Sequence, residues 1–422
     1  MINKDVIKDY LLKGNFGLER ETLRTTTDGF MSSTPHPFDP KDKEVERDFC
    51  EEQVEIITPV CKSIEELYST LNRIHHKVAG PLEKLPTGPE YLWPFSNAPY
   101  IKRQADIPVA EFYGDLADKT AYRKYLAIKY GKRKMIFSGI HYNFSFDKEM
   151  LKKSWDGEGE LQDYIDQVYL NLAAGLMQYS WLIVYLTSAS PLYDESLEWD
   201  EHVGRTSFDH YGSRRNSEIG YWNYFVPFLN YDSVHEYVDS IVNYVDEGLI
   251  GASSEIYIPI RLKPRGINTV ENLKNTGIDH IELRMLDLNP LTKLNIFKED
   301  IYFIHFFVLY ISTFYHRPYN KYRQVRSIVN HKRAAKFESD EIFMLYGDDE
   351  VPVKVAVQSL LDHMREFYHD LGVNEADEYL DYQERKLQSE DNRYCKQVFD
   401  LYQDNYVMKG VQTAIKYAKE DK

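Results

Sequence analysis

Hydrophobic and polar residues alternate with a two-residue period in several short segments of the first 290 residues. This period is typical of β-strands with two unlike faces, whereas a period near 3.6 residues is typical of helices. The alternation predicts strands over 16–25, 30–34, 47–58, 134–146, 255–263 and 278–288. The longer period predicts helices over 63–85, 120–130, 160–187, 233–245, 296–314, 351–371 and 374–417. Helices of unequal length separate the strands, so we expect an α+β fold with an antiparallel or mixed sheet.

The pattern changes near residue 290, after which almost everything is predicted to be helical. We therefore expect a sheet-and-helix region over 1–295 and a helical region over 296–422 that packs on it as part of one structural unit. The stretch 167–193 has no charged residue and is long enough to span a membrane. Its polar residues Asn171 and Gln178 favour a buried helix instead, so we expect no membrane association. The first ten residues contain no continuous apolar stretch, so we expect no signal peptide.

Four of the predicted strands combine an apolar face with a face that carries ionisable or polar residues. These polar faces carry Glu19 and Glu21, His141, Asn143 and Ser145, Tyr257 and Arg261, and Glu282 and Arg284. For any single strand, a water-facing side of an antiparallel sheet explains the pattern. Glu19 and Glu21, however, would repel each other unless a cation lies between them.

Taken together, the residue types favour a metal site. The candidates are Glu19, Glu21, Asp48, Glu52, Glu55, Glu282 and His141, with Arg215, Arg261 and Arg284. Carboxylates with one imidazole and several guanidinium groups suit Mg²⁺ or Mn²⁺ beside phosphate. Asp48 and Glu55 are seven residues apart, so a regular strand would point them to opposite faces. Either a bulge intervenes or Asp48 lies at the start of the strand.

Composition narrows the functional class. The 422 residues include 51 Lys and Arg against 67 Asp and Glu, a net charge of −16 that argues against a nucleic-acid-binding protein. Three cysteines are too few for a disulfide framework and favour a cytoplasmic setting. No GxxxxGK[ST], GxGxxG or HExxH motif occurs. Carboxylates that could bind a metal, together with several arginines, predict phosphoryl transfer from ATP, with the phosphates held without a glycine-rich loop.

Seven motifs carry a resemblance to a known family. They are GLERETLR (17–24), TPHP (34–37), DFCEEQVEIITP (48–59), LWP (92–94), YR..L...YG (122–131), SGIHYNFS (138–145) and IELRMLDLNP (281–290). The chain resembles glutamate-cysteine ligase, especially the bacterial form that is also the first part of bifunctional glutathione-synthesising enzymes. The motifs span about the first 290 residues, and the resemblance is weak after them.

The resemblance implies a glutamine-synthetase-like carboxylate-amine ligase, in which a curved antiparallel sheet lines a funnel and helices pack outside. It makes 1–295 the catalytic region. ATP would phosphorylate the side-chain carboxylate of glutamate, and the amine of cysteine would attack the acyl phosphate. The products would be γ-glutamylcysteine, ADP and phosphate, which is the first step of glutathione synthesis. The oligomeric state stays open.

Site residues follow from the same resemblance, motif by motif. The residues that match Mg²⁺ ligands are Glu19, Glu21, Asp48, Glu55, His141 and Glu282. Those that match arginines at the transferring phosphoryl group are Arg215 and Arg284. Those that match the surroundings of the amine acceptor are Phe49, Tyr122, Leu126, Asn143, Tyr221 and Tyr257.

One residue departs from the family pattern. Where members carry glutamine, three residues before the Ser-Gly of SGIHYN, this chain has Met135. A thioether would replace a polar contact, which leaves open whether the acceptor is cysteine or another small amine. A shift of one residue in the strand is the alternative explanation. A catalytically silent nucleotide-binding paralogue is disfavoured, because every inferred metal ligand keeps a side chain that can bind a metal.

Overall fold

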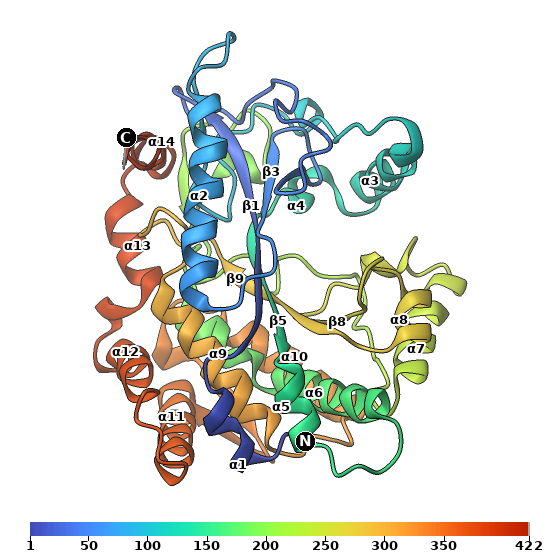
Figure 1. Cartoon of the computed structure of the whole chain (residues 1–422). Coiled ribbons are helices and arrows are strands. Elements are labelled where there is room, and N and C mark those ends of the chain that lie inside the picture. The colour runs from blue at the N-terminus through green and yellow to red at the C-terminus, as the bar shows by residue number, and fades with distance from the viewer. Residues whose placement is uncertain (421–422) are drawn as a thin grey trace.

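A seven-stranded antiparallel sheet forms the centre of the computed structural model, which describes residues 1–420 and all their side chains except that of Asp115 (Figure 1). The strand order is β2-β3-β1-β5-β9-β8, and β4 pairs with β1. These strands are β1 (Gly14–Thr26), β2 (Val45–Arg47), β3 (Gln53–Ile57), β4 (Glu90–Leu92), β5 (Gly139–Phe146), β8 (Ile260–Lys263) and β9 (His280–Asp287). Two small hairpins are β6 (Leu192–Asp194) with β7 (Thr206–Phe208), and β10 (Phe343–Tyr346) with β11 (Asp349–Pro352). The predicted combination of helices with an antiparallel sheet is confirmed.

Helices surround this sheet. The longer ones are α2 (Ile64–Leu82), α3 (Ala117–Tyr130), α6 (Leu161–Thr187), α7 (Val234–Asp246), α9 (Lys298–Ser312), α10 (Lys321–Ala334), α11 (Val353–Asp370), α12 (Asp377–Gln388), α13 (Tyr394–Tyr402) and α14 (Tyr406–Lys419). Shorter ones are α1 (Lys4–Ile7), α4 (Lys132–Met135), α5 (Lys148–Ser154) and α8 (Val270–Thr276). The helices that follow β9 gather on one side of the molecule, with the C-terminal α14 beside α2 (Figure 1).

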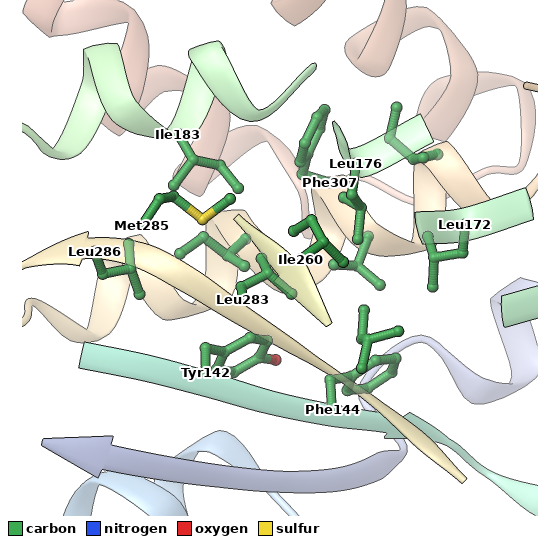
Figure 2. Close-up of a cluster of buried hydrophobic side chains, with 14 of the residues drawn as sticks. Tyr142, Phe144, Leu172, Leu176, Ile183, Ile260, Leu283, Met285, Leu286 and Phe307 are labelled. Atoms are coloured by element: carbon green, nitrogen blue, oxygen red, sulfur yellow. The ribbon is translucent and has the colours of Figure 1, made fainter. Parts of the chain in front are cut away.

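The hydrophobic core lies between one face of the sheet and helices α2, α6 and α9. Figure 2 shows Tyr142 of β5 and Leu283 of β9 in one apolar cluster with Leu176 of α6 and Phe307 of α9. These side chains come from the apolar faces that the alternation predicts. Burial of this face fixes the strand register, because a slip of one residue would turn every apolar side chain to the opposite face.

Most of the charge-free stretch 167–193 lies in helix α6, which ends at Thr187. Nearly every residue of α6 from Val168 to Thr187 is buried, so the predicted core helix is confirmed. Asn171 is buried, and its side-chain amide donates to the carbonyl of Phe314 at 2.7 Å. Within residues 1–420, no helix combines the length and apolar character that crossing a bilayer requires.

Several predicted strands differ from the structure. The strand predicted over 47–58 is wrong, because β2 and β3 form a hairpin joined by a turn over 48–52. Residues 132–135 form α4, so the strand predicted over 134–146 begins only at Gly139. The strand predicted over 255–263 is shortened to β8 because its first part is irregular. Residues 30–34 form only isolated pairings with Thr25 and Tyr100.

The C-terminal region also departs from the prediction. The helix predicted over 374–417 is wrong, because this segment is divided into α12, α13 and α14. Polar caps explain the divisions: the side chain of Ser389 accepts a backbone N–H after α12, and Asn405 caps α14. Helix α10 was missed because its sequence is rich in Arg and Lys and poor in apolar residues. The division of the chain at residues 295 and 296 stays a prediction.

A buried ion pair ties the TPHP motif to the sheet. Arg24 of β1 lies 2.6 Å from Glu90 of β4, and both side chains are almost completely buried. The Arg24 guanidinium also donates to the carbonyls of Thr34 at 2.6 Å and Glu51 at 3.0 Å. The Thr34 hydroxyl in turn donates to Glu90 at 2.7 Å. This motif therefore has a structural role in the described molecule.

We expect the Glu90→Ala substitution to lower the free energy of unfolding by about 3–5 kcal/mol, because it leaves the Arg24 charge buried and unpaired. Urea denaturation of the purified protein measures this change. Asp106→Ala is the matched control, since Asp106 pairs with Arg103 at 2.9 Å on the surface, where ion pairs add little. An equal effect of the two substitutions would contradict the structural role of Arg24.

Candidate active site

The polar face of the sheet brings together carboxylates from β1, β3 and β9. Strand pairing places Glu19 opposite His141 and Glu21 opposite Glu55. It also places Glu282 opposite Asn143. Residues directly opposite each other in neighbouring strands point to the same face. The alternation therefore predicted the face correctly, and the pairing adds which side chains meet.

Two groups of side chains on this face could hold a metal ion. Glu19, His141 and Glu282 form the first group, and Glu21, Glu55 and His141 form the second. In each group, ligand atoms lie within 4.8 Å of one another. The two ring nitrogens of His141 lie 3.1 Å from a Glu19 oxygen and 3.5 Å from a Glu21 oxygen. His141 therefore lies between the two groups.

Asp48 lies at the edge of this arrangement. It follows β2 in the hairpin turn, and its backbone N–H donates to the carbonyl of Gln53 at 3.1 Å. Because Asp48 and Glu55 lie on opposite sides of the hairpin, neither a bulge nor the start of a single strand is needed to bring them together. Asp48 is close enough to raise the pKa of Glu55, but neither of the two groups includes it.

A β-bulge in β9 lies beside His141. The pairing of β5 with β9 is regular on both sides of His141, but β9 advances three residues where β5 advances two. Met285 and Leu286 consequently both enter the apolar cluster, as Figure 2 shows. The next residue, Asp287, is turned to the polar face, opposite Gly139. Bulges commonly redirect side chains beside active sites.

Positive charge is distributed unevenly among the carboxylates. Burial opposes ionisation of Glu282, but Arg284 and Lys263 hold its pKa well below the usual range. Lys263 lies 3.1 Å and Arg284 3.0 Å from its two oxygens. Burial raises the pKa of Glu55 well above its usual range, and the negative charges of Asp48 and neighbouring glutamates raise it further. The negative charge on the β9 side of the face is thus balanced by neighbouring cations, whereas the negative charge on the β3 side is not.

Arg215 and Arg284 line one small pocket with Tyr221 and Tyr257. The structure therefore brings together both arginines and two of the residues expected around an acceptor. The Tyr221 and Tyr257 rings are in contact, with centroids 4.2 Å apart. Lys263 was not among the predicted site residues. The sequence could have indicated it, because Lys263 comes two residues after Arg261 and therefore lies on the same face of β8.

Most of the other expected acceptor residues share an apolar cluster with Tyr257. Its members include Phe49, Tyr122, Leu126, Met135 and Tyr221. The hydroxyl of Tyr122 accepts a hydrogen bond from Ser254 at 3.1 Å, and burial raises its pKa to about 12. Asn143 lies instead among the carboxylates, where its amide donates to Glu19 at 3.0 Å. Met135 lies in α4, so a shift of strand register does not account for it.

Comparison with known proteins identifies the family. The family model described as glutamate-cysteine ligase matches residues 1–250 and 245–333. A glutamate–cysteine ligase of Clostridium acetobutylicum is 32% identical over 408 residues, which cover 84% of each chain. This chain belongs to the glutamate-cysteine ligase family. The glutathione biosynthesis bifunctional protein GshAB of Clostridium perfringens is 35% identical over 438 residues, covering 99% of this chain and 55% of the relative.

Two solved structures share the fold of this chain. A bifunctional glutathione synthetase from Pasteurella multocida has a TM-score of 0.83 at 27% identity, covering 99% of this chain and 54% of that one. A glutamate–cysteine ligase from Francisella tularensis in complex with AMP has a TM-score of 0.87 at 22% identity, covering 97% and 89%. This chain thus spans about half the length of the bifunctional relatives that it matches.

Glu52 lies apart from the site, contrary to the prediction. It immediately precedes β3, where the two-residue period gives it the side of Val54 and Ile56, opposite to that of Glu55. The side chain is fully buried, and burial raises its pKa to about 8. Neither metal-competent group among the described residues includes it.

We expect Glu52 to make the stability of the protein fall as pH rises. Between the ordinary glutamate pKa near 4.5 and the folded-state pKa of about 8, only the unfolded chain ionises this carboxyl, and unfolding is favoured. Glu52→Gln removes this titration. The variant should therefore gain stability relative to the parent from pH 4.5 to 8, with no further gain above pH 8. Urea denaturation across pH checks this expectation, and a difference independent of pH would contradict it.

Proposed function

We propose that this protein is an ATP-dependent ligase that joins the γ-carboxylate of glutamate to the amine of L-cysteine through γ-glutamyl phosphate. This is the first step of glutathione synthesis. The observation that carries the proposal is the meeting of two carboxylate–imidazole groups and two arginines on one sheet face, in a chain of the glutamate-cysteine ligase family. The curved, funnel-lining sheet of glutamine-synthetase-like ligases is the fold that we propose for it.

The proposed cofactor is Mg²⁺, with Mn²⁺ as the alternative. Hard carboxylate oxygens with a single imidazole fit either ion. Glu19 and Glu282 would bind at one position and Glu21 and Glu55 at the other, with Asp48 at the rim. Because a neutral imidazole has one lone pair, His141 would ligate only one ion. When bound, the ions would offset charge on the ATP phosphates.

Arg215 and Arg284 are the groups that we propose to act on the transferring phosphoryl group. The Arg284 guanidinium lies 3.0 Å from Glu282, and that of Arg215 lies against Gly139. Glu282 raises the pKa of Arg284 although burial opposes this, so Arg284 stays charged. A planar guanidinium can donate two parallel hydrogen bonds to phosphate oxygens. In a partly buried site, such donors stabilise charge that grows on the acyl phosphate in the transition state.

The apolar cluster beside the arginines is the proposed acceptor site. Phe49, Leu126 and the tyrosine rings would exclude water, which otherwise hydrolyses an acyl phosphate. Asn143 would contact the bound amino acid from the carboxylate side. The second candidate function keeps glutamate activation but uses another small amine, and the buried thioether of Met135 favours it.

A coupled ADP-release assay with glutamate, Mg²⁺ and a panel of small amines tests both candidates. The leading proposal expects the highest kcat/KM with cysteine and a γ-glutamylcysteine product by mass spectrometry. A higher kcat/KM with another amine would establish the second candidate, and Met135→Gln should then shift preference toward cysteine. Absence of any amine-dependent turnover would indicate a catalytically silent paralogue.

We expect Arg284→Lys to lower kcat by about 100-fold while it changes KM for glutamate far less. The lysine keeps the charge but loses the two-pronged donor, which matters most as transition-state charge develops. Steady-state kinetics with glutamate varied gives both constants. The control is Arg265→Lys, since Arg265 is exposed and pairs with Asp279. Equal changes in kcat and KM would contradict this role of Arg284.

A further inference from the structure

We propose that Asp287 is a positioning residue for Arg215, and that it acts by anchoring the loop over 213–217 to the end of β9. The proposal rests on the proposed role of Arg215 in phosphoryl transfer. Asp287 belongs to the IELRMLDLNP motif, but it has no place in the predicted site.

The guanidinium of Arg215 needs such an anchor. Among the side chains that the structure describes, no carboxylate forms an ion pair with it, although its own side chain is buried. Its position therefore depends on its backbone and on the surface that it lies against. That surface is Gly139: a β-carbon at Gly139 would lie 2.5 Å from Cζ of Arg215. Any larger residue at this position would displace the guanidinium.

Asp287 fastens the loop through both carboxylate oxygens. Oδ2 accepts from the backbone N–H of Ala189 at 3.0 Å and from the hydroxyl of Ser190 at 2.8 Å. Oδ1 accepts from the hydroxyl of Ser213 at 2.9 Å and from the side-chain amide of Asn216 at 3.4 Å. Ser213 and Asn216 flank Arg215 on its two sides. One buried carboxylate thus holds the loop to the end of α6 and to β9.

Asn216 extends the same anchor. Its amide donates to the carbonyl of Met285 at 2.8 Å, and its side-chain oxygen lies 3.2 Å from a ring nitrogen of His331. The other ring nitrogen of His331 lies 2.9 Å from the hydroxyl of Ser180 on α6. The loop is therefore fixed to β9, α6 and α10 together. Strand β9 also carries Glu282 and Arg284. The attachment of the loop to β9 therefore fixes the position of Arg215 relative to these two residues.

The bulge in β9 makes this arrangement possible. In a regular strand, Asp287 would share the apolar side with Leu283 and Met285. The extra residue turns Asp287 to the polar face, opposite Gly139, on which Arg215 lies. The backbone N–H of Gly139 donates to Glu21 at 2.9 Å. The same pair of strands thus positions Arg215 relative to the second carboxylate group.

The experiment measures kcat in a double-mutant cycle of Asp287→Asn with Arg215→Met. Asparagine keeps the shape of the side chain but has one acceptor oxygen in place of two. We expect Asp287→Asn to lower kcat by about 10- to 100-fold with a much smaller change in KM, as for a misplaced catalytic group. In the Arg215→Met background it should have no further effect, because it acts through Arg215. Equal fold-losses in the two backgrounds would overturn the proposal.

Asp194→Asn is the matched control for folding. Asp194 is also a buried aspartate that accepts from backbone N–H groups, those of Ser196 and Gly204, away from the carboxylate face. We expect it to lower thermal stability about as much as Asp287→Asn but to leave kcat near the parent value. A loss of kcat as large as that of Asp287→Asn would overturn the proposal.

A readout independent of activity separates this proposal from the proposed function. In a crystal structure of Asp287→Asn, we expect Arg215 to have left its place on Gly139, and an unmoved Arg215 would overturn the inference. If Asp287→Asn does not fold, Ser213→Ala provides the test, because it removes the hydrogen bond from the loop to Oδ1 of Asp287. Arg215 is then expected to be displaced, and an unmoved Arg215 would overturn the inference. If the parent protein shows no glutamate-dependent ADP release, the proposed function is refuted. The role of Asp287 is then still tested, because the crystal structures of the parent and the variant show whether Arg215 has moved.

Discussion

Carboxylates that repel one another are gathered on the polar face of the sheet, and the rest of the fold holds them there. Glu19, Glu21, Glu55 and Glu282 meet around His141 on one face of the sheet, where full or partial burial strengthens the repulsion between like charges. The opposite face of the same strands packs against α2, α6 and α9 in a continuous apolar core. Hydrophobic burial on that face keeps the strands in register and so holds the carboxylates together against their repulsion.

The repulsion is offset on one side of the face only. Lys263 and Arg284 flank Glu282, whereas Glu55 has acidic neighbours and a raised pKa. A divalent cation is stabilised most where the negative charge has the fewest cationic neighbours, which is at β3. Anionic groups are stabilised most where guanidinium and ammonium groups gather, which is along β8 and β9. The sheet thus offers a gradient of charge along which metal ions and phosphate oxygens can be arranged side by side.

The sequence predicted the two faces of the sheet well and the connections between strands poorly. Alternation is a local property, so Glu19, Glu21 and Glu282 could be assigned to polar faces without knowledge of their neighbours. That Glu21 lies opposite Glu55 is set by long-range pairing, which periodicity does not encode. The hairpin around Asp48 was missed for the same reason, and the burial of Glu52 went unrecognised with it.

The bulge at Arg284 and Met285 interrupts an alternation that looks regular in the sequence. The orientation of Asp287 could therefore not be predicted from the alternation. Arg215 was a candidate through its residue type and through the family resemblance, because nothing in the periodicity of its loop distinguishes it.

Whether these carboxylates hold a metal can be measured as the binding of Mn²⁺ in the presence of a non-hydrolysable ATP analogue, followed by electron paramagnetic resonance. We expect the parent chain to bind Mn²⁺, and Glu55→Gln, with its fold intact, to bind it at least tenfold more weakly. Glu65→Gln, a change in a surface glutamate on α2, should leave the affinity unchanged. Equal Mn²⁺ affinity in the parent and Glu55→Gln would contradict the claim that these carboxylates converge to hold a metal.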